Sequence, residues 1–221
     1  MLPDAVLFDL YDTLVVSDWR RHADFVAGAL GVSAEALAEA YRARRENIDR
    51  GRTTDAAGLL IEVAAHCGVS LSPEGASELA AAEAEFLRGN VEVYDDTFDV
   101  IRRLAFNGVK TAVVSNCSPS TRPVVDHLGL ESEVGAVVLS CEAGMAKPDP
   151  EIFRFALERL GADPQRSWFV DDRGDYLDGA RRLGMRTARI ARGHSFGEDV
   201  AGGDHPVIER LGELFDLFDL T

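Results

Sequence analysis

Acidic residues, hydroxyls and a lysine follow short apolar runs at four places in the chain, and these are the residues that could carry out chemistry. Near the N-terminus, the apolar residues 6–8 lead directly into Asp9, and Asp12 and Thr13 follow closely. An apolar run that ends in polar residues is typical of a buried strand, and open parallel sheets bind ligands beyond the carboxyl ends of their strands. We therefore expect Asp9 at the edge of a sheet, facing a crevice. An ordinary turn or helix-cap role is the alternative.

Three later segments repeat the arrangement of an apolar run followed by polar groups. They supply Ser115 and Asn116 after residues 111–115, Lys147 just ahead of a helix that begins at Pro150, and Asp171, Asp172 and Asp175 after residues 167–170. If the strands are parallel, all of these groups lie along one edge of the sheet.

The types of these residues indicate phosphoryl chemistry. Carboxylates from two strands can bind Mg²⁺, a hard ion that takes one or two protein carboxylates together with water and substrate oxygens. A lysine beside them offsets their mutual repulsion, and Ser115 can hydrogen-bond a phosphoryl oxygen. A carboxylate such as that of Asp9 can act as a nucleophile once charge around the electrophile is neutralised.

A parallel sheet is what the rest of the chain predicts. After residue 95, β-rich segments alternate with helical ones, which is the pattern of βαβ units. Strands are expected over about 111–115, 136–140, 167–170, 187–191 and 206–209, and helices over about 97–106 and 150–160, up to residue 183 and up to residue 218. Ser118 and Pro119 are expected to begin a helix whose free N–H groups face the crevice.

Residues 17–89 have a different character, because Ala, Glu and Arg dominate and apolar residues recur with helical spacing. Helices are expected over about 18–30, 33–50, 55–67 and 73–88, with glycines as stops and Ser72 and Pro73 as an N-cap pair. Four helices with short connections predict a small bundle. The predicted division is therefore a core of residues 1–16 and 90–221 with an inserted helical domain of residues 17–89.

The arginines of the segment 41–45 are expected on a solvated helix face, paired with glutamates, except that Arg42 could clamp the substrate. The apolar run 211–220 is expected to pack on the sheet, and an exposed part of it could support a homodimer. Cys117, beside Asn116, is interpreted as a small buried filler.

Composition excludes several classes of function. The 221 residues include 23 basic and 38 acidic ones, for a net charge of −15, so a nucleic-acid partner is not expected. The chain contains no apolar run of membrane-spanning length and no basic leader, so no membrane partner is expected. The three cysteines have no CxxC spacing, which argues against a disulfide framework or a zinc site and favours a cytoplasmic protein.

The order of these segments resembles the haloacid dehalogenase superfamily of hydrolases, in the subgroup with a helical cap inserted after the first motif. The resemblance covers the whole chain. It rests on the segment 8–14 as motif I, 114–116 as motif II, 147–153 as motif III, and 169–172 with the glycine-containing pairs 179–180 and 184–185 as motif IV. It implies an α/β fold in which a three-layer Rossmann-like core, with a central and mostly parallel sheet, carries an inserted α-helical cap.

The resemblance also implies roles for individual residues. Asp9 would be the nucleophile, Thr13 and Ser115 would hold the transferred group, and Lys147 would steady the negative charge. Asn116, Tyr11 and Arg42 would contact the substrate. The metal ligands would be Asp9, the backbone carbonyl of Tyr11 and Asp171, with Asp172 or Asp175 as a further contact.

Two positions give conflicting indications: residue 11 differs from the phosphatases of the family, and residue 171 differs from its dehalogenases. Phosphatases carry an acid–base aspartate where this chain has Tyr11, and a tyrosine there resembles the metal-independent L-2-haloacid dehalogenases, as does the pair Tyr41 and Arg42. Dehalogenases carry serine where this chain has Asp171, and an extra carboxylate beside Asp9 makes most sense with a cation bound.

The sequence therefore favours a Mg²⁺-dependent phosphatase that acts on a small phosphate ester through an aspartyl-phosphate on Asp9. A metal-independent dehalogenase is the first alternative. A non-catalytic binding protein on the same fold is the second, because the lost general acid typically contributes ~10²–10⁴-fold to the rate.

Overall fold

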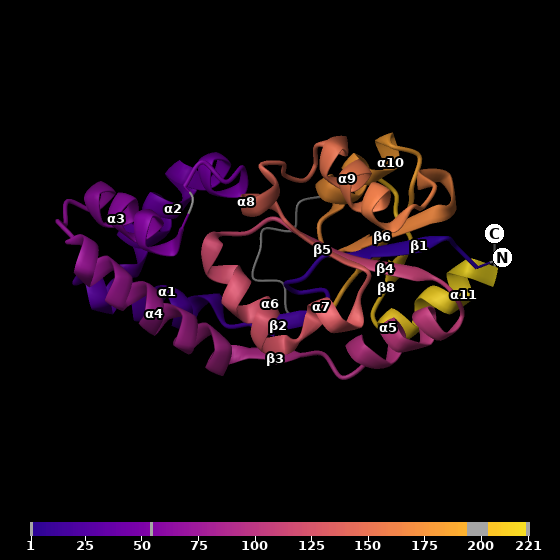
Figure 1. The fold of residues 1–221 in the computed structure, drawn as a ribbon, viewed down its shortest axis with the longest axis horizontal. Coiled ribbons are helices and arrows are strands. Elements are labelled where there is room, and N and C mark those ends of the chain that lie inside the picture. Colours follow the sequence, from indigo (N-terminus) through magenta and orange to yellow (C-terminus); the bar gives the residue numbers. More distant parts are fainter. Residues whose placement is uncertain (1, 54, 194–202, 220–221) are drawn as a thin grey trace.

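A six-stranded parallel sheet forms the centre of the larger part of the molecule, to the right in Figure 1. The computed structural model describes residues 2–53, 55–193 and 203–219. In the spatial order β5-β4-β1-β6-β7-β8, every pair of neighbours is parallel. The strands are β1 (Ala5–Phe8), β4 (Lys110–Ser115), β5 (Ala136–Leu139), β6 (Ser167–Asp171), β7 (Arg186–Ile190) and β8 (Val207–Ile208). The predicted parallel sheet is thus confirmed.

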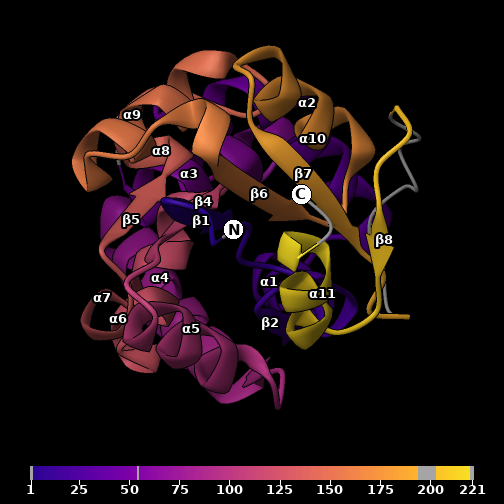
Figure 2. The ribbon, with the colours of Figure 1, turned by 90° about the vertical axis from the view of Figure 1, so that its right-hand side faces the viewer.

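Helices cover both faces of this sheet, so the core has three layers (Figure 2). Alternate residues of β1 point to opposite layers: Val6 and Phe8 pack in one apolar cluster, and Ala5 and Leu7 pack in another. The first layer contains α5 (Thr97–Phe106), α6 (Arg122–Leu128), α7 (Leu130–Glu133), η3 (Leu211–Glu213) and α11 (Leu214–Asp219). The second contains α9 (Pro150–Leu160) and α10 (Gly174–Arg182), while α8 (Ser140–Ala143) follows β5 and η2 (Pro164–Arg166) precedes β6. The expected α/β fold class is confirmed.

Four helices between residues 19 and 90 form a separate bundle with its own apolar core, to the left of the sheet in Figure 1. They are α1 (Trp19–Leu30), α2 (Ala34–Asp49), α3 (Ala56–His66) and α4 (Pro73–Asn90). Each begins at a side-chain cap, as Ser72 shows by accepting a hydrogen bond from the N–H of Gly75, with Pro73 at the first helical position. The four expected helices are confirmed, although α4 continues past Gly89, which was expected to end it.

A short antiparallel ribbon joins the bundle to the sheet. Its strands are β2 (Val15–Ser17) and β3 (Val91–Val93), in the register Val15↔Val93. The sequence did not predict these strands. The chain leaves the sheet through β2 and returns through β3, and these two strands lie side by side. The ribbon therefore supports the proposed division into a core of residues 1–16 and 90–221 and a cap of residues 17–89. This division stays a prediction.

The structure corrects one expected helix start. Ser118 precedes the 3₁₀ turn η1 (Pro119–Thr121) and makes no side-chain cap hydrogen bond, and the α-helix α6 begins only at Arg122. No helix within the described residues is both long and apolar enough to cross a membrane.

Candidate active site

The carboxyl ends of β1, β4 and β6 meet at the edge of the sheet that faces the helical bundle. Parallel pairing sets Phe8 level with Val113 and Val170, so Asp9 and Asp171 leave adjacent strands at the same height. The N–H of Asp9 donates to the carbonyl of Val170 at 2.9 Å, which fixes this register at the strand end. The expectation that these groups share one edge is thereby met.

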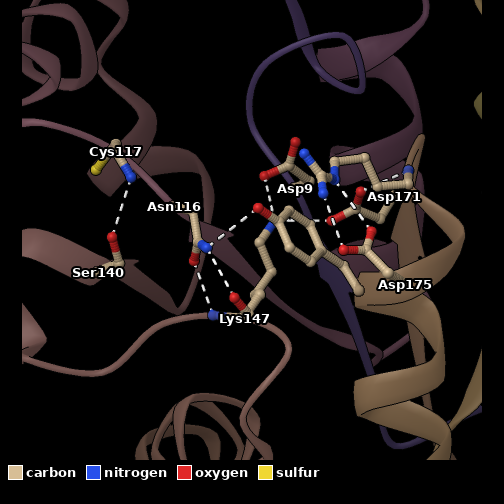
Figure 3. A network of polar contacts seen from close by, with 9 residues as sticks. Asp9, Asn116, Cys117, Ser140, Lys147, Asp171 and Asp175 are labelled. Atoms are coloured by element: carbon tan, nitrogen blue, oxygen red, sulfur yellow. Dashed lines mark hydrogen bonds and ion pairs between the residues drawn. The ribbon is translucent and has the colours of Figure 1, made fainter. Parts of the chain in front are cut away.

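Lys147 lies between two of the carboxylates (Figure 3). Its Nζ donates to Asp9 Oδ1 at 2.5 Å and to Asp171 Oδ2 at 2.7 Å, and only 4% of the residue is exposed. The two carboxylates raise the pKa of the ammonium even though burial lowers it. The lysine is therefore a fixed positive charge at neutral pH.

Asn116 holds the segment that carries Lys147. Its Oδ1 accepts from the backbone N–H of Lys147 at 2.8 Å, and its Nδ2 donates to the carbonyl of the same residue at 2.9 Å. Nδ2 also lies 3.3 Å from the hydroxyl of Tyr176. The amide of Asn116 therefore positions the lysine, and the expected contact of Asn116 with a substrate stays a prediction.

The side chains of Asp9, Asp171 and Asp172 form an acidic cluster whose oxygens lie within 4.8 Å of one another. Burial raises the pKa of Asp171 to about 7 and those of Asp9 and Asp172 to about 6, against the effect of Lys147, and repulsion between the carboxylates acts in the same direction as burial. One lysine thus leaves the cluster short of positive charge. A set of three close carboxylate oxygens fits a hard divalent cation such as Mg²⁺.

Asp175 is not part of this cluster. Both of its oxygens bind the guanidinium of Arg173, at 3.1 and 2.9 Å. Asp172 is therefore the better candidate of the two for the further metal contact. Arg173 lies over the ring of Tyr176, which also faces Lys147 at 4.8 Å, and the sequence interpretation missed the contribution of this tyrosine.

Tyr11 is turned toward Thr121, with its hydroxyl 3.2 Å from Oγ1, and its ring packs against Trp19 at 4.7 Å between centroids. Burial raises the pKa of the Tyr11 phenol above its ordinary value. The phenol is thus an even weaker acid than a free tyrosine and a poor replacement for an acid–base aspartate.

Two buried hydroxyls lie beside Asp9 in the chain and at the end of β4. Thr13 is fully buried, and its Oγ1 makes no hydrogen bond to any residue that the structure describes. Ser115, 1% exposed, is the last residue of β4. A buried hydroxyl without a partner costs free energy, which an anionic ligand could recover by accepting its hydrogen bond.

The structure does not bring Arg42 to this edge. Its guanidinium binds Glu39 of the same helix, and 69% of the side chain is exposed. The cap instead contacts the core through Arg50, whose Nη2 donates to Asp149 at 2.6 Å, and through Gly51, which lies against the carbonyl of Cys141. Sequence reasoning missed both contacts.

Comparisons with known proteins agree with this geometry. The model of the haloacid dehalogenase-like hydrolases matches residues 3–184. A glyceraldehyde 3-phosphate phosphatase of Methanopyrus kandleri is 31% identical over 86% of this chain and 84% of its own length. The (S)-2-haloacid dehalogenase 4A of Burkholderia cepacia is 30% identical over 85% of this chain and 83% of its own length.

The fold has close counterparts among solved structures as well. The L-2-haloacid dehalogenase of Xanthobacter autotrophicus with chloropropionic acid covalently bound superimposes with a TM-score of 0.69, covering 99% of both chains at 24% identity. At that identity the likeness concerns the fold alone.

Proposed function

The chain belongs to the haloacid dehalogenase-like hydrolases, and on that premise we propose that it is a Mg²⁺-dependent phosphatase that acts on small anionic phosphate esters. The acidic cluster of Asp9, Asp171 and Asp172 carries the proposal. A carboxylate nucleophile gains nothing from two further carboxylates at close range unless a cation neutralises them.

Asp9, Asp171 and Asp172 would hold the ion, and the backbone carbonyl of Tyr11 remains a further candidate ligand. When bound, Mg²⁺ supplies charge neutralisation between the nucleophile and the phosphoryl oxygens. The side chains Thr13, Ser115 and Lys147 would donate hydrogen bonds to those oxygens as charge builds up on them.

In the first step, a carboxylate oxygen of Asp9 attacks phosphorus, an aspartyl-phosphate forms, and the bond to the ester oxygen breaks. In the second, water attacks, the bond between Asp9 and phosphorus breaks, and inorganic phosphate leaves with the carboxylate restored. Tyr11 does not protonate the leaving oxygen, so turnover should favour esters whose leaving group departs as a stable anion.

The test is hydrolysis of 4-nitrophenyl phosphate with and without Mg²⁺. We expect Asp9→Asn and Asp171→Asn to abolish turnover. Asp175→Asn is the matched control, because its carboxylate is committed to Arg173 in the same segment, and it should keep most of the activity. Metal-independent turnover, or full activity in Asp9→Asn, would refute the proposal.

A haloacid dehalogenase is the second candidate, and Tyr11 is the observation that favours it. Here Asp9 would displace halide from carbon, and water would then hydrolyse the resulting ester. Chloride release from 2-chloropropionate in the presence of a chelator would establish this reaction. Absence of both activities, with retained binding of phosphate, would leave a binding protein.

A further inference from the structure

Two cysteines meet beyond the carboxyl ends of β4 and β5, and one of them follows Asn116 in the chain. Cys117 and Cys141 each come two residues after the paired residues Ser115 and Leu139 of the neighbouring strands β4 and β5. Because the two strands are parallel, both thiols lie at the same edge of the sheet. Their Sγ atoms lie 3.8 Å apart, and Cys117 is buried whereas Cys141 is partly exposed.

The two thiols differ in the way that a redox pair requires. The contact with the Cys117 thiol lowers the pKa of Cys141, and the nearby Arg122 acts in the same direction. Burial and the same contact raise the pKa of Cys117. An accessible thiol with thiolate character beside a second, resolving thiol is the arrangement found in oxidation-sensitive cysteines.

We propose that Cys117 and Cys141 form a reversible disulfide that switches the active site off when an oxidant reaches Cys141. Nothing in the proposed hydrolysis uses either thiol. Disulfides in intracellular proteins, where they occur, are commonly transient and redox-sensing.

The reaction balances with hydrogen peroxide as the oxidant. The thiolate of Cys141 attacks one peroxide oxygen, the O–O bond breaks, and the departing hydroxide takes up a proton as water. The sulfur of Cys117 then attacks the sulfenic acid, the S–S bond forms, and the hydroxyl of the sulfenic acid leaves as water with the proton of Cys117. Two thiols lose two electrons, and one peroxide becomes two waters.

The bond would pull on the residue that positions the catalytic lysine. The sulfurs must close from 3.8 Å to about 2.05 Å. Cys117 follows Asn116, whose amide holds the backbone of Lys147 from both sides, and its own N–H donates to Ser140 Oγ at 3.0 Å (Figure 3). A shift of about 1 Å in a positioning group can cost about 10²-fold in rate.

The same disulfide would also affect the contact between the cap and the core. The carbonyl of Cys141 abuts Gly51 so closely that a Cβ there would lie 1.9 Å from it. Movement of Cys141 therefore disturbs the place where the end of α2 rests on the core.

The test treats the Cys67→Ser protein with hydrogen peroxide and maps its peptides by mass spectrometry. Trypsin leaves both cysteines on one peptide, because Arg122 is the only trypsin site between them and it precedes Pro123. A protease that cleaves after glutamate separates them at Glu131 and Glu133. We expect the two resulting fragments to be joined, with the mass of two hydrogens lost, and to separate on reduction with dithiothreitol.

Activity is measured on the same samples. The oxidised protein should lose about 10²-fold of its aryl phosphatase activity and regain it with dithiothreitol. Cys141→Ser should be insensitive to peroxide, and the Cys67→Ser background should respond like the wild type.

Thiols that stay free, or a joined pair with undiminished turnover, would overturn the proposal. The link is scored by mass, so it does not depend on the proposed function. A reduced protein without turnover would count against the phosphatase assignment and leave the disulfide to be decided by the mass measurement.

Discussion

At the scale of single residues, the site is organised by a shortage of positive charge. Lys147 forms ion pairs with both Asp9 and Asp171. Asp172 lies in the same cluster, and among the described contacts it has no ion pair with the lysine. Burial makes this shortage costly, because water cannot screen the carboxylates. The result is a strong preference either for protons or for a cation.

The stability of the metal-free protein should fall as the pH rises from about 4 to about 7. Across this window the unfolded chain has released the protons of Asp9, Asp171 and Asp172, whereas the folded chain still holds them at pKa values of about 6 to 7. The folded state thus binds more protons, and its free energy of unfolding decreases with pH. Thermal unfolding in a chelator at constant ionic strength measures this slope.

Asp171→Asn should flatten the slope, and Mg²⁺ should stabilise the wild type more at pH 8 than at pH 5. The variant provides the control, because the net charge of −15 also changes with pH in both proteins. Equal slopes in the two proteins would show that the cluster does not carry the effect.

Thr13→Val should separate function from stability. The hydroxyl of Thr13 has no partner within the described chain, so its removal should leave the free energy of unfolding unchanged or slightly higher. The same change should lower kcat/KM by about tenfold or more, because one hydrogen bond to the transferred group is lost. Denaturant unfolding and steady-state kinetics give the two readouts.

Thr97→Val is the matched control for this prediction. Its Oγ1 donates to the buried carbonyl of Leu14 at 2.7 Å, so the substitution should cost about 1–3 kcal/mol of stability and leave kcat/KM nearly unchanged. If Thr13→Val loses stability and keeps activity, Thr13 is structural.

At the scale of elements, polar side chains join the cap to the core on two sides. Glu83 of α4 bridges His22 of α1, at 2.8 Å, and Ser120 of η1, at 2.9 Å. On the other side, Arg50 after α2 reaches Asp149 in front of α9. These contacts hold the four-helix bundle over the acidic edge of the sheet, where it would exclude water from the proposed reaction.

Gly51→Ala should prevent the cap from seating on the core. The added Cβ would lie 1.9 Å from the Cys141 carbonyl, and the backbone has a φ of 63°. We expect kcat/KM to fall by about 10²-fold, with faster hydrogen exchange in the contact between α2 and α8.

Gly68→Ala is the control for Gly51→Ala, because it introduces the strain of a positive φ without a steric clash. Gly68 has a φ of 77° and no neighbour within 4 Å of an added Cβ. Its substitution should therefore cost about 1 kcal/mol of stability and leave catalysis nearly unchanged. Equal losses of activity in the two variants would mean that strain, and not cap seating, is responsible.

At the scale of the whole molecule, the net negative charge of the protein repels the anionic substrate that we propose for it. The net charge of the chain is −15. Salt screens the long-range repulsion, so kcat/KM for an aryl phosphate should rise about threefold from ~10 mM to ~200 mM NaCl at fixed Mg²⁺. Sucrose at equal osmolality should have no such effect, and a fall with NaCl would show that local positive charge dominates.

The sequence predicted the elements better than the contacts between side chains. Helix caps such as Ser72 and the apolar runs of the parallel strands are local signals, so their positions were readable. The ribbon of β2 and β3 was missed because each strand has only three residues and pairs across the whole inserted bundle.

Side-chain direction explains the rest of what could not be predicted. Asp9 and Asp171 come together because strand register places them, which residue spacing anticipates. Lys147 lies in the loop before α9 and is positioned by the amide of Asn116. Arg42 pairs with Glu39 at the i,i+3 spacing expected for the solvated arginines of this segment, so local spacing indicates this contact rather than a substrate clamp. By contrast, the meeting of Cys117 with Cys141 depends on which strands are neighbours, and local spacing does not encode that.

The antiparallel ribbon also marks a point at which the helical bundle could be cut from the core. Leu14 accepts a hydrogen bond from the N–H of Tyr94 at 3.1 Å, so the points where the chain leaves and re-enters the core are already neighbours. A short turn spliced between them would close the backbone without stretching the sheet. On the proposed division into core and cap, we expect that the helical bundle could be exchanged at this junction for a bundle from another family member, so that the proposed carboxylate chemistry acts on a different ester.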